Sequence, residues 1–194
     1  MVKQKRKVEK KDLIQAEIYA ENRKKYRKEL LEYKKNRRVP LGPYASFYFE
    51  NFYTMLGQIQ EMLHIEKGGD EQLKDELNAY NPLIPKGNEL VATLMFEIED
   101  IILRQKFLNS VGGIEKNVYI QINNEKIIAD AEKDVDRTSE EGKASSVQFL
   151  HFVFTDEQIA KFKNFAHEVE IGINHPKYFY KTKIIKKTRE ALIK

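Results

Sequence analysis

The spacing of apolar residues changes once along this chain of 194 residues, and that change limits the folds it can adopt. Up to about residue 80, apolar residues recur every three or four positions, as in amphipathic helices. We expect helices over about 12–37, 51–66 and 70–79. From about residue 90, apolar residues alternate with polar ones or form short runs, which is typical of strands. We expect the main strands over about 90–98, 118–122, 127–131, 147–154 and 169–173, with the last one at a sheet edge.

The order of these elements favours one fold class. A long basic helix and a central helix occupy the first half, and the strands follow in the second half. Because the connections between strands are short, antiparallel pairing is favoured. We therefore predict an α+β fold, in which the helical first half packs on a largely antiparallel sheet of about five strands.

Local patterns also predict how the long first helix begins and ends. Asp12 followed by Gln15 resembles a capping box, in which each side chain accepts a hydrogen bond from the other residue's backbone. Pro40 disfavours helical geometry at the residue before it, so the helix should end there. Pro40, Gly42 and Pro43 are then expected to form a stiff connector, which is followed by a short strand at about 47–49 and by the helix over 51–66.

Charge is strongly segregated along the chain. Residues 1–38 carry a net charge of +9 and residues 177–194 carry +6, whereas the stretch between them carries −11. Highly charged segments with few apolar residues do not fold alone. We predict a basic flexible arm over 1–11, a single α+β domain over 12–176 and a basic C-terminal tail over 177–194.

Composition excludes several classes of protein. The chain contains no cysteine, so disulfides, thiolate nucleophiles and cysteine-ligated iron–sulfur clusters are excluded. No run of 18 apolar residues is present, which predicts no membrane span. The charged amino terminus is not followed by the apolar run of a secretory signal. Neither Gly-x-Gly-x-x-Gly nor a Walker loop occurs. We expect a cytoplasmic protein with no cofactor.

A polar stripe on the helix over 51–66 is the main candidate for a site. Glu50, Thr54, Gln58 and Glu61 share one face, which carries no lysine or arginine. Helical spacing separates Glu50 from Glu61 by roughly 16 Å, so these two carboxylates cannot share a proton as a catalytic dyad. They either anchor nearby backbone or arginines, or contact a ligand. The predicted binding surface consists of Arg37, Arg38, Glu50, Gln58, Gln60, Glu61 and His175.

Two histidines enter the search for a metal site. Glu61 and His64 have the Glu-x-x-His spacing of di-iron helical bundles, but no second such pair is present. These two residues are therefore only weak metal candidates, and we predict no metal site. His175 precedes a proline, which holds its backbone extended at the end of a predicted strand.

Long motifs are spread between about residues 10 and 180. They include Phe49-Glu50-Asn51, Gln58-Ile59-Gln60-Glu61-Met62-Leu63, Ala79-Tyr80-Asn81-Pro82-Leu83-Ile84-Pro85 and Asn174-His175-Pro176-Lys177-Tyr178. In these motifs the chain resembles a bacterial family catalogued as domain of unknown function 3501. The resemblance implies no established activity, but an association with rubrerythrin-like and iron–sulfur redox proteins. At His64 and His151 the family pattern more often has arginine, which argues against ligand roles for these two residues.

Three functions remain open from the sequence. The first is a non-enzymatic binding or accessory protein with a protein partner, linked to redox or iron-protein maintenance. The second is nucleic-acid binding through the basic arm and the first helix, with salt-dependent affinity. The third is a metal-dependent enzyme that uses Glu61, His64 and His175. The absence of a recognisable nucleophile–base grouping favours a protein without catalytic activity.

Overall fold

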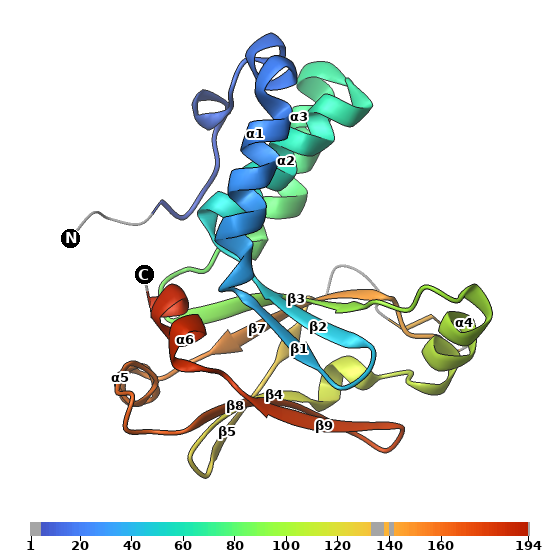
Figure 1. Ribbon diagram of the computed structural model, residues 1–194, viewed down its shortest axis with the longest axis vertical. Coiled ribbons are helices and arrows are strands. Elements are labelled where there is room, and N and C mark those ends of the chain that lie inside the picture. The colour runs from blue at the N-terminus through green and yellow to red at the C-terminus, as the bar shows by residue number, and fades with distance from the viewer. Residues whose placement is uncertain (1–4, 133–137, 140–141, 194) are drawn as a thin grey trace. The chain divides into compact units, whose positions relative to one another are not determined.

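The computed structural model describes residues 5–132, 138–139 and 142–193, and the chain forms two compact units (Figure 1). The helical unit comprises Met1–Asn36 and Glu50–Lys86, and the β unit comprises Arg37–Phe49 and Gly87–Lys194. The α+β class is confirmed. The domain boundaries expected near residues 11 and 176 do not match the limits of these two units. The expected boundaries follow changes in net charge along the sequence, whereas the units are groups of residues in contact.

The helical unit contains three helices and two single 3₁₀ turns within the described residues. Its elements are η1 (Lys10–Asp12), α1 (Ala16–Lys35), α2 (Phe52–Glu66), α3 (Gly69–Tyr80) and η2 (Asn81–Leu83). In sequence order, each helix packs against the next. Among the described residues, every helix is too short or too polar to span a lipid bilayer.

Local chemistry explains the limits of α2. The Asn51 side chain accepts a hydrogen bond from Thr54 N at 3.1 Å, and Thr54 Oγ1 accepts one from Asn51 N at 2.9 Å. This reciprocal capping satisfies two amides that the first helical turn leaves unpaired. The helix ends at Lys67, whose φ of 55° is left-handed and stops the helical path.

The capping box predicted for the first helix is wrong. Asp12 pairs backwards with Glu9 and closes η1, and the residue that precedes α1, Gln15, makes no side-chain capping bond. The carboxylate of Asp12 accepts from Glu9 N at 3.1 Å and binds Lys5. Asp12 has a residue suitable for a capping pair three positions before it, Glu9, and another three positions after it, Gln15. In the structure its partners are Glu9 and Lys5, which both precede it.

The β unit is built from two antiparallel sheets (Figure 1). In spatial order, the first contains β1 (Arg38–Leu41), β2 (Ala45–Phe49), β3 (Glu89–Phe96), β7 (Val147–Val153) and β6 (Asp130–Ala131). The second contains β5 (Glu125–Ile128), β4 (Val118–Ile122), β8 (Val169–His175) and β9 (Tyr178–Lys183). The remaining helical segments of this unit are α4 (Ile101–Ser110), η3 (Ile114–Asn117), α5 (Asp156–Lys163) and α6 (Lys186–Ile193).

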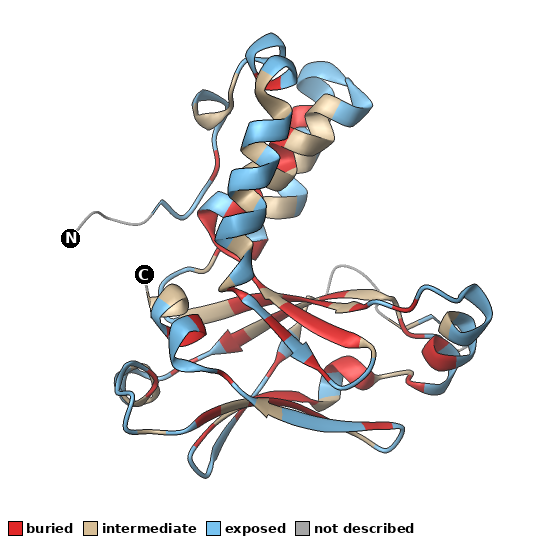
Figure 2. Ribbon diagram, in the orientation of Figure 1, coloured by how far each residue is buried: buried red, intermediate tan, exposed pale blue. Residues whose placement is uncertain are grey.

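A single apolar core fills the space between the two sheets. Alternate residues along the strands belong to this core. Figure 2 marks the buried segments of both sheets in red. Phe47, Leu94 and Phe152 come from the first sheet, and Ile120 and Ile171 come from the second. Because strand side chains alternate between faces, each sheet contributes one apolar face to this core.

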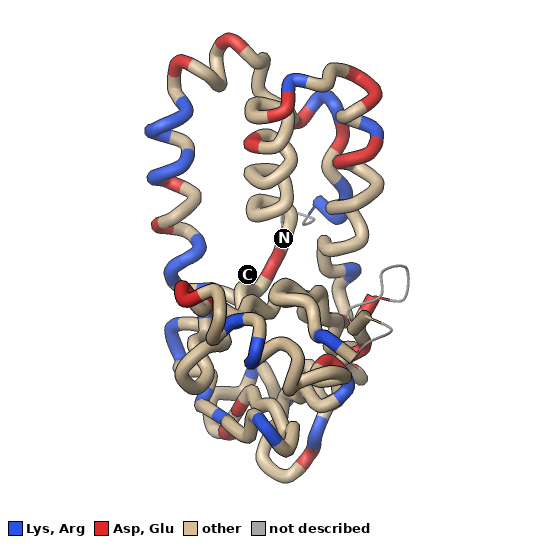
Figure 3. The backbone as a smooth tube through the Cα atoms, turned by 90° about the vertical axis from the view of Figure 1, so that its right-hand side faces the viewer, with Lys and Arg blue, Asp and Glu red and all other residues tan. Residues whose placement is uncertain are grey.

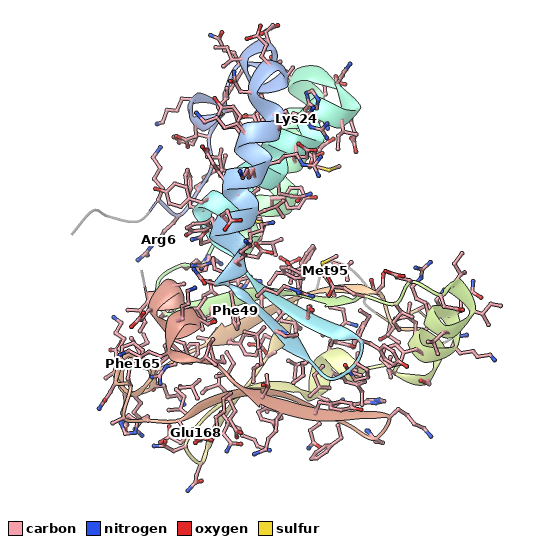
Figure 4. The ribbon with its side chains drawn as sticks, viewed as in Figure 1. Arg6, Lys24, Phe49, Met95, Phe165 and Glu168 are labelled. Carbon is pink, nitrogen blue, oxygen red and sulfur yellow. The ribbon has the colours of Figure 1, made fainter. Side chains whose placement is uncertain are left out.

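Two predictions for the C-terminal region differ from the structure. The strand near 169–173 was expected at a sheet edge, but β8 lies between β4 and β9. Glu168 and Glu170 pair with Lys183 and Lys181 at 2.9 and 3.0 Å. Glu168 precedes the first residue of β8 (Figure 4). The second prediction is the basic tail over 177–194, a range that contains β9 and α6. Two of its lysines, Lys181 and Lys183, are matched by these acidic residues.

The stretch expected to be a stiff connector forms the β1–β2 hairpin. Gly42 lies in its turn with a φ of +62°, and a Cβ there would lie 2.7 Å from Tyr178 Oη. That hydroxyl donates to Leu41 O and accepts from the backbone N of Tyr44 and Ala45, at 2.5, 3.1 and 3.0 Å. Tyr178 of β9 thus joins the second sheet to the hairpin of the first. Gly42 leaves the space that this ring needs.

Between β6 and β7, residues 133–137 and 140–141 lie outside the described residues. At the N-terminal arm, Val8 is fully buried and Lys10–Asp12 form η1, so part of this segment belongs to the folded helical unit.

Candidate functional site

Glu61 is the centre of a charged network that joins α1 to α2. Nε of Arg23 donates to both carboxylate oxygens at 3.2 Å, and its Nη2 donates to Oε1. Tyr19 Oη donates to Oε2 at 2.8 Å. Arg27 Nη1 lies 3.7 Å from Oε1, which is an ion pair without a direct hydrogen bond. Arginine binding through two nitrogens is among the stronger charged contacts.

This network changes the acidity of its members. Hydrogen bonding from Arg23 lowers the pKa of Glu61 to about 2, although burial acts in the opposite direction. Burial raises the pKa of Tyr19 to about 12, and its hydrogen bond to the Glu61 carboxylate adds to the effect. At neutral pH Glu61 is therefore ionised and Tyr19 is protonated. A carboxylate held this firmly is a poor general base.

Two side-chain amides hold backbone segments in the helical unit. Gln60 donates to Ile14 O at 3.1 Å and accepts from Ile14 N at 2.8 Å. Asn81 makes the same pair of bonds to Val8, at 3.2 and 2.7 Å. Each amide mimics a neighbouring strand, because it offers one donor and one acceptor to the same residue. These amide clamps hold the segment that precedes α1 against the helices.

The space between α1 and α2 is not completely filled. A cavity of about 130 Å³ lies there, which we call the α1–α2 cavity. Its lining is mostly apolar and aromatic, with Arg27 among the polar residues. At one wall, Leu30 approaches Gly57 so closely that a Cβ on the glycine would lie 2.5 Å from the leucine side chain. The lining residues are Asp12, Ile14, Tyr19, Tyr26, Arg27, Leu30, Tyr53, Leu56, Gly57 and Gln60.

The remaining predicted site residues of the helical unit have separate contacts. Gln58 Nε2 lies 3.4 Å from Tyr80 Oη, a long hydrogen bond. Glu50 is buried and is the first residue of Glu50–Lys86, the second segment of the helical unit. The ring of His64 packs against Tyr19 with centroids 5.6 Å apart. Three residues of the polar stripe, Thr54, Gln58 and Glu61, thus bind partners within the helical unit.

The predicted arginines belong to the β unit. Arg37 is buried, and its guanidinium donates to Phe49 O at 3.0 Å and to Ala191 O at 2.6 Å. Arg38 donates to Glu97 Oε2 at 2.8 Å. Glu97 also accepts from the hydroxyls of Ser46 and Tyr48, each at 2.6 Å. Burial would raise the pKa of Glu97, but the hydrogen bonds from Ser46, Tyr48 and Arg38 together lower it.

The other histidines also have local partners. His175 Nδ1 accepts from Lys177 N at 3.2 Å, within the β8–β9 turn. His151 lies between two carboxylates, with Nδ1 at 3.0 Å from Glu89 and Nε2 at 3.8 Å from Glu132. Across residues 5–132, 138–139 and 142–193, no group of three or more histidine and carboxylate side chains is placed to hold a metal ion.

The basic ends of the chain differ in how far their charges are matched. Lys10 pairs with Asp70 at 2.7 Å, in addition to the pairs of Lys181 and Lys183 described above. Lysines and arginines recur along α1 between acidic residues, whereas α2 carries carboxylates without lysine or arginine (Figure 3). On α1, Lys24, Lys25 and Lys28 are exposed and form no ion pair with any residue that the structure describes.

Sequence reasoning missed the partners of Glu61. Tyr19, Arg23 and Arg27 are spaced four residues apart and so share one face of α1. That four-residue repeat was a usable signal for the face of α1 that meets α2. Glu97 and its cluster were also missed, because their residues are distant in sequence.

Comparison with known proteins supports the family resemblance and adds no activity. The family model described as "Protein of unknown function (DUF3501)" matches residues 7–194. The crystal structure of a novel protein of unknown function from Burkholderia pseudomallei K96243 is similar, with a TM-score of 0.86 and 34% identity over 96% of both chains. No curated protein matches the chain.

Proposed function

Because this chain belongs to the DUF3501 family, whose function is unknown, we propose from its own contacts that it is a non-enzymatic binding protein, and that its helical unit holds a small ligand in the α1–α2 cavity. The cavity is the observation that carries the proposal. Concave, largely apolar sites with a few polar groups are the usual form of small-molecule sites. The neighbouring Glu61 network supports a binding role over catalysis, since its groups are held in fixed protonation states.

A substitution that fills the cavity tests this proposal. Leu30→Phe adds a ring at the wall of the cavity, whereas Leu31→Phe adds the same ring at an exposed position that does not line it. The melting temperatures of wild type and both variants would be measured against a panel of small organic acids, amines, alcohols and neutral aromatic compounds. A ligand that binds only the folded state raises the melting temperature.

We expect at least one compound to stabilise wild type and Leu31→Phe, but not Leu30→Phe. The proposal fails if no compound stabilises wild type, or if every compound that does so stabilises Leu30→Phe equally. The association with iron–sulfur redox proteins implied by the family resemblance stays a prediction, as does a protein partner.

Nucleic-acid binding is a second candidate, favoured by the unmatched charges of Lys24, Lys25 and Lys28. Replacing all three lysines by glutamine should weaken retention of a mixed-sequence single-stranded RNA near 50 mM salt. The slope of log affinity against log salt should fall by roughly 2, at about 0.7 per phosphate contact. Lys181→Gln with Lys183→Gln is the control, because these lysines are already ion-paired. Absence of retention by wild type removes this candidate.

A further inference from the structure

The size of the α1–α2 cavity limits the body of its ligand. Its volume of about 130 Å³ is close to the roughly 150 Å³ of an engineered apolar cavity that binds benzene. Tyr26, Tyr53, Leu30 and Leu56 supply much of the lining. A single ring or a short branched chain therefore fits, whereas a nucleotide or a sugar phosphate is too large and too polar.

Arg27 is the polar group of the lining that is best placed to bind such a ligand. Its side chain is 56% exposed, and within the described part of the chain its guanidinium makes no hydrogen bond. Gln60, by contrast, has one donor and its acceptor bonded to Ile14. Glu61 is already bound by Arg23 and Tyr19, so Arg27 retains its donors for another acceptor.

The local charge favours an anion. Asp12 also lines the cavity, but its carboxylate is paired with Lys5. Glu61 is neutralised by Arg23, its closest cationic partner. The groups counted are the two carboxylates, of Asp12 and Glu61, and three cationic side chains, of Lys5, Arg23 and Arg27. Their net charge is one positive charge, which we assign to Arg27. A single carboxylate at the mouth of the cavity would balance that charge.

We infer that the α1–α2 cavity binds a small monocarboxylate with an aromatic or branched aliphatic body, and that Arg27 binds its carboxylate. This inference rests on the proposed function and specifies its ligand class. The planar guanidinium matches a carboxylate with two parallel hydrogen bonds, which lysine cannot reproduce. The tyrosine rings and leucines receive the apolar body, whose transfer from water supplies the non-directional part of the affinity.

Benzoate and benzamide are the probes, because they share a ring and differ in charge. Their binding to wild type, Arg27→Gln, Lys28→Gln and Leu30→Phe would be measured by isothermal titration calorimetry. Lys28→Gln is the matched control, since it removes a neighbouring charge on the same helix from a residue that does not line the cavity. Circular dichroism checks that each variant is folded.

We expect wild type to bind benzoate about tenfold more tightly than benzamide, as one charge-assisted contact predicts. Arg27→Gln should remove this preference, Lys28→Gln should keep it, and Leu30→Phe should weaken both probes. If both probes bind equally and Leu30→Phe weakens both, the carboxylate assignment is wrong although the cavity still binds ligands. If neither probe binds wild type, the inference is refuted, and the melting-temperature measurements with the compound panel decide the proposed function separately.

Discussion

Arg23 on α1 and Glu61 on α2 are separated by 38 residues in the sequence, yet two nitrogens of one guanidinium bind the same carboxylate. Tyr19 adds a third donor from the same face of α1. Only Tyr19 is buried among the residues of α1. This charged junction therefore replaces much of the apolar packing that usually holds a helix of this length in place.

The first prediction concerns the stability that this junction provides. Glu61→Gln keeps the shape of the side chain but removes its charge, so it leaves Arg23 without a counter-ion. We expect the free energy of unfolding to fall by about 1–3 kcal/mol, in the range for hydrogen bonds to charged groups. Urea denaturation measures the change. Glu32→Gln is the control, because it removes an exposed pair with Lys35 and should leave stability unchanged.

A second prediction follows from the acidity of Glu61. Its pKa is about 2 in the folded protein and near 4.5 when unfolded. Between these values the unfolded state binds more protons, so stability decreases as the pH falls. The contribution of Glu61 is fully present above about pH 4.5 and is lost as the pH approaches 2. The stability difference between wild type and Glu61→Gln should shrink over this window. A difference that stays constant across it would contradict the assigned pKa.

A third prediction tests the amide clamps. Gln60→Ala removes both bonds to Ile14, and Asn81→Ala removes both bonds to Val8. Each backbone amide should then exchange its hydrogen faster, while the other clamp keeps its protection. Hydrogen–deuterium exchange detected by NMR resolves the two amides. Each variant is thereby the control for the other, and simultaneous loss of protection at both residues would show that the segment unfolds as one unit.

A fourth prediction concerns the contact of Tyr178 with the β1–β2 hairpin. Tyr178→Phe keeps the ring but leaves Leu41 O and the amide of Ala45 without this partner in a buried position. We expect destabilisation by about 1–3 kcal/mol, the cost of unpaired buried polar groups. Urea denaturation gives the value. Tyr180→Phe is the control because its ring is half-exposed, and an equal loss in both variants would reject a specific role for the Tyr178 hydroxyl.

Elements set by nearby residues could be predicted from the sequence. The helix expected over 51–66 matches α2 at Phe52–Glu66, because glycines after it and an apolar stripe along it are local signals. The capping box of Thr155 and Gln158 can likewise be read directly from the sequence and opens α5. At Asp12 the same spacing fits a pair with Gln15 or a pair with Glu9. The sequence pattern predicted the pair with Gln15, whereas the structure contains the pair with Glu9.

Relationships between distant elements could not be predicted in this way. Alternation in β8 shows that one face is apolar, but it does not specify which strands lie on either side of it. The same limit applies to the candidate site. Glu61 was identified on a polar stripe, but its partners depend on which face of α1 meets α2, which no local pattern determines. The α1–α2 cavity is a property of that packing and has no signature in either helix alone.

The order in which the two units alternate along the chain has a consequence for folding during synthesis. The chain crosses between units after residues 36, 49 and 86, so β1 and β2 are made before α2 and α3. These two strands pair with each other, but β2 must wait for β3, which begins at Glu89. At about 5–20 residues per second this interval lasts seconds. The helical unit can therefore be complete while the hairpin still exposes an unpaired strand, and no single cut would release either unit whole.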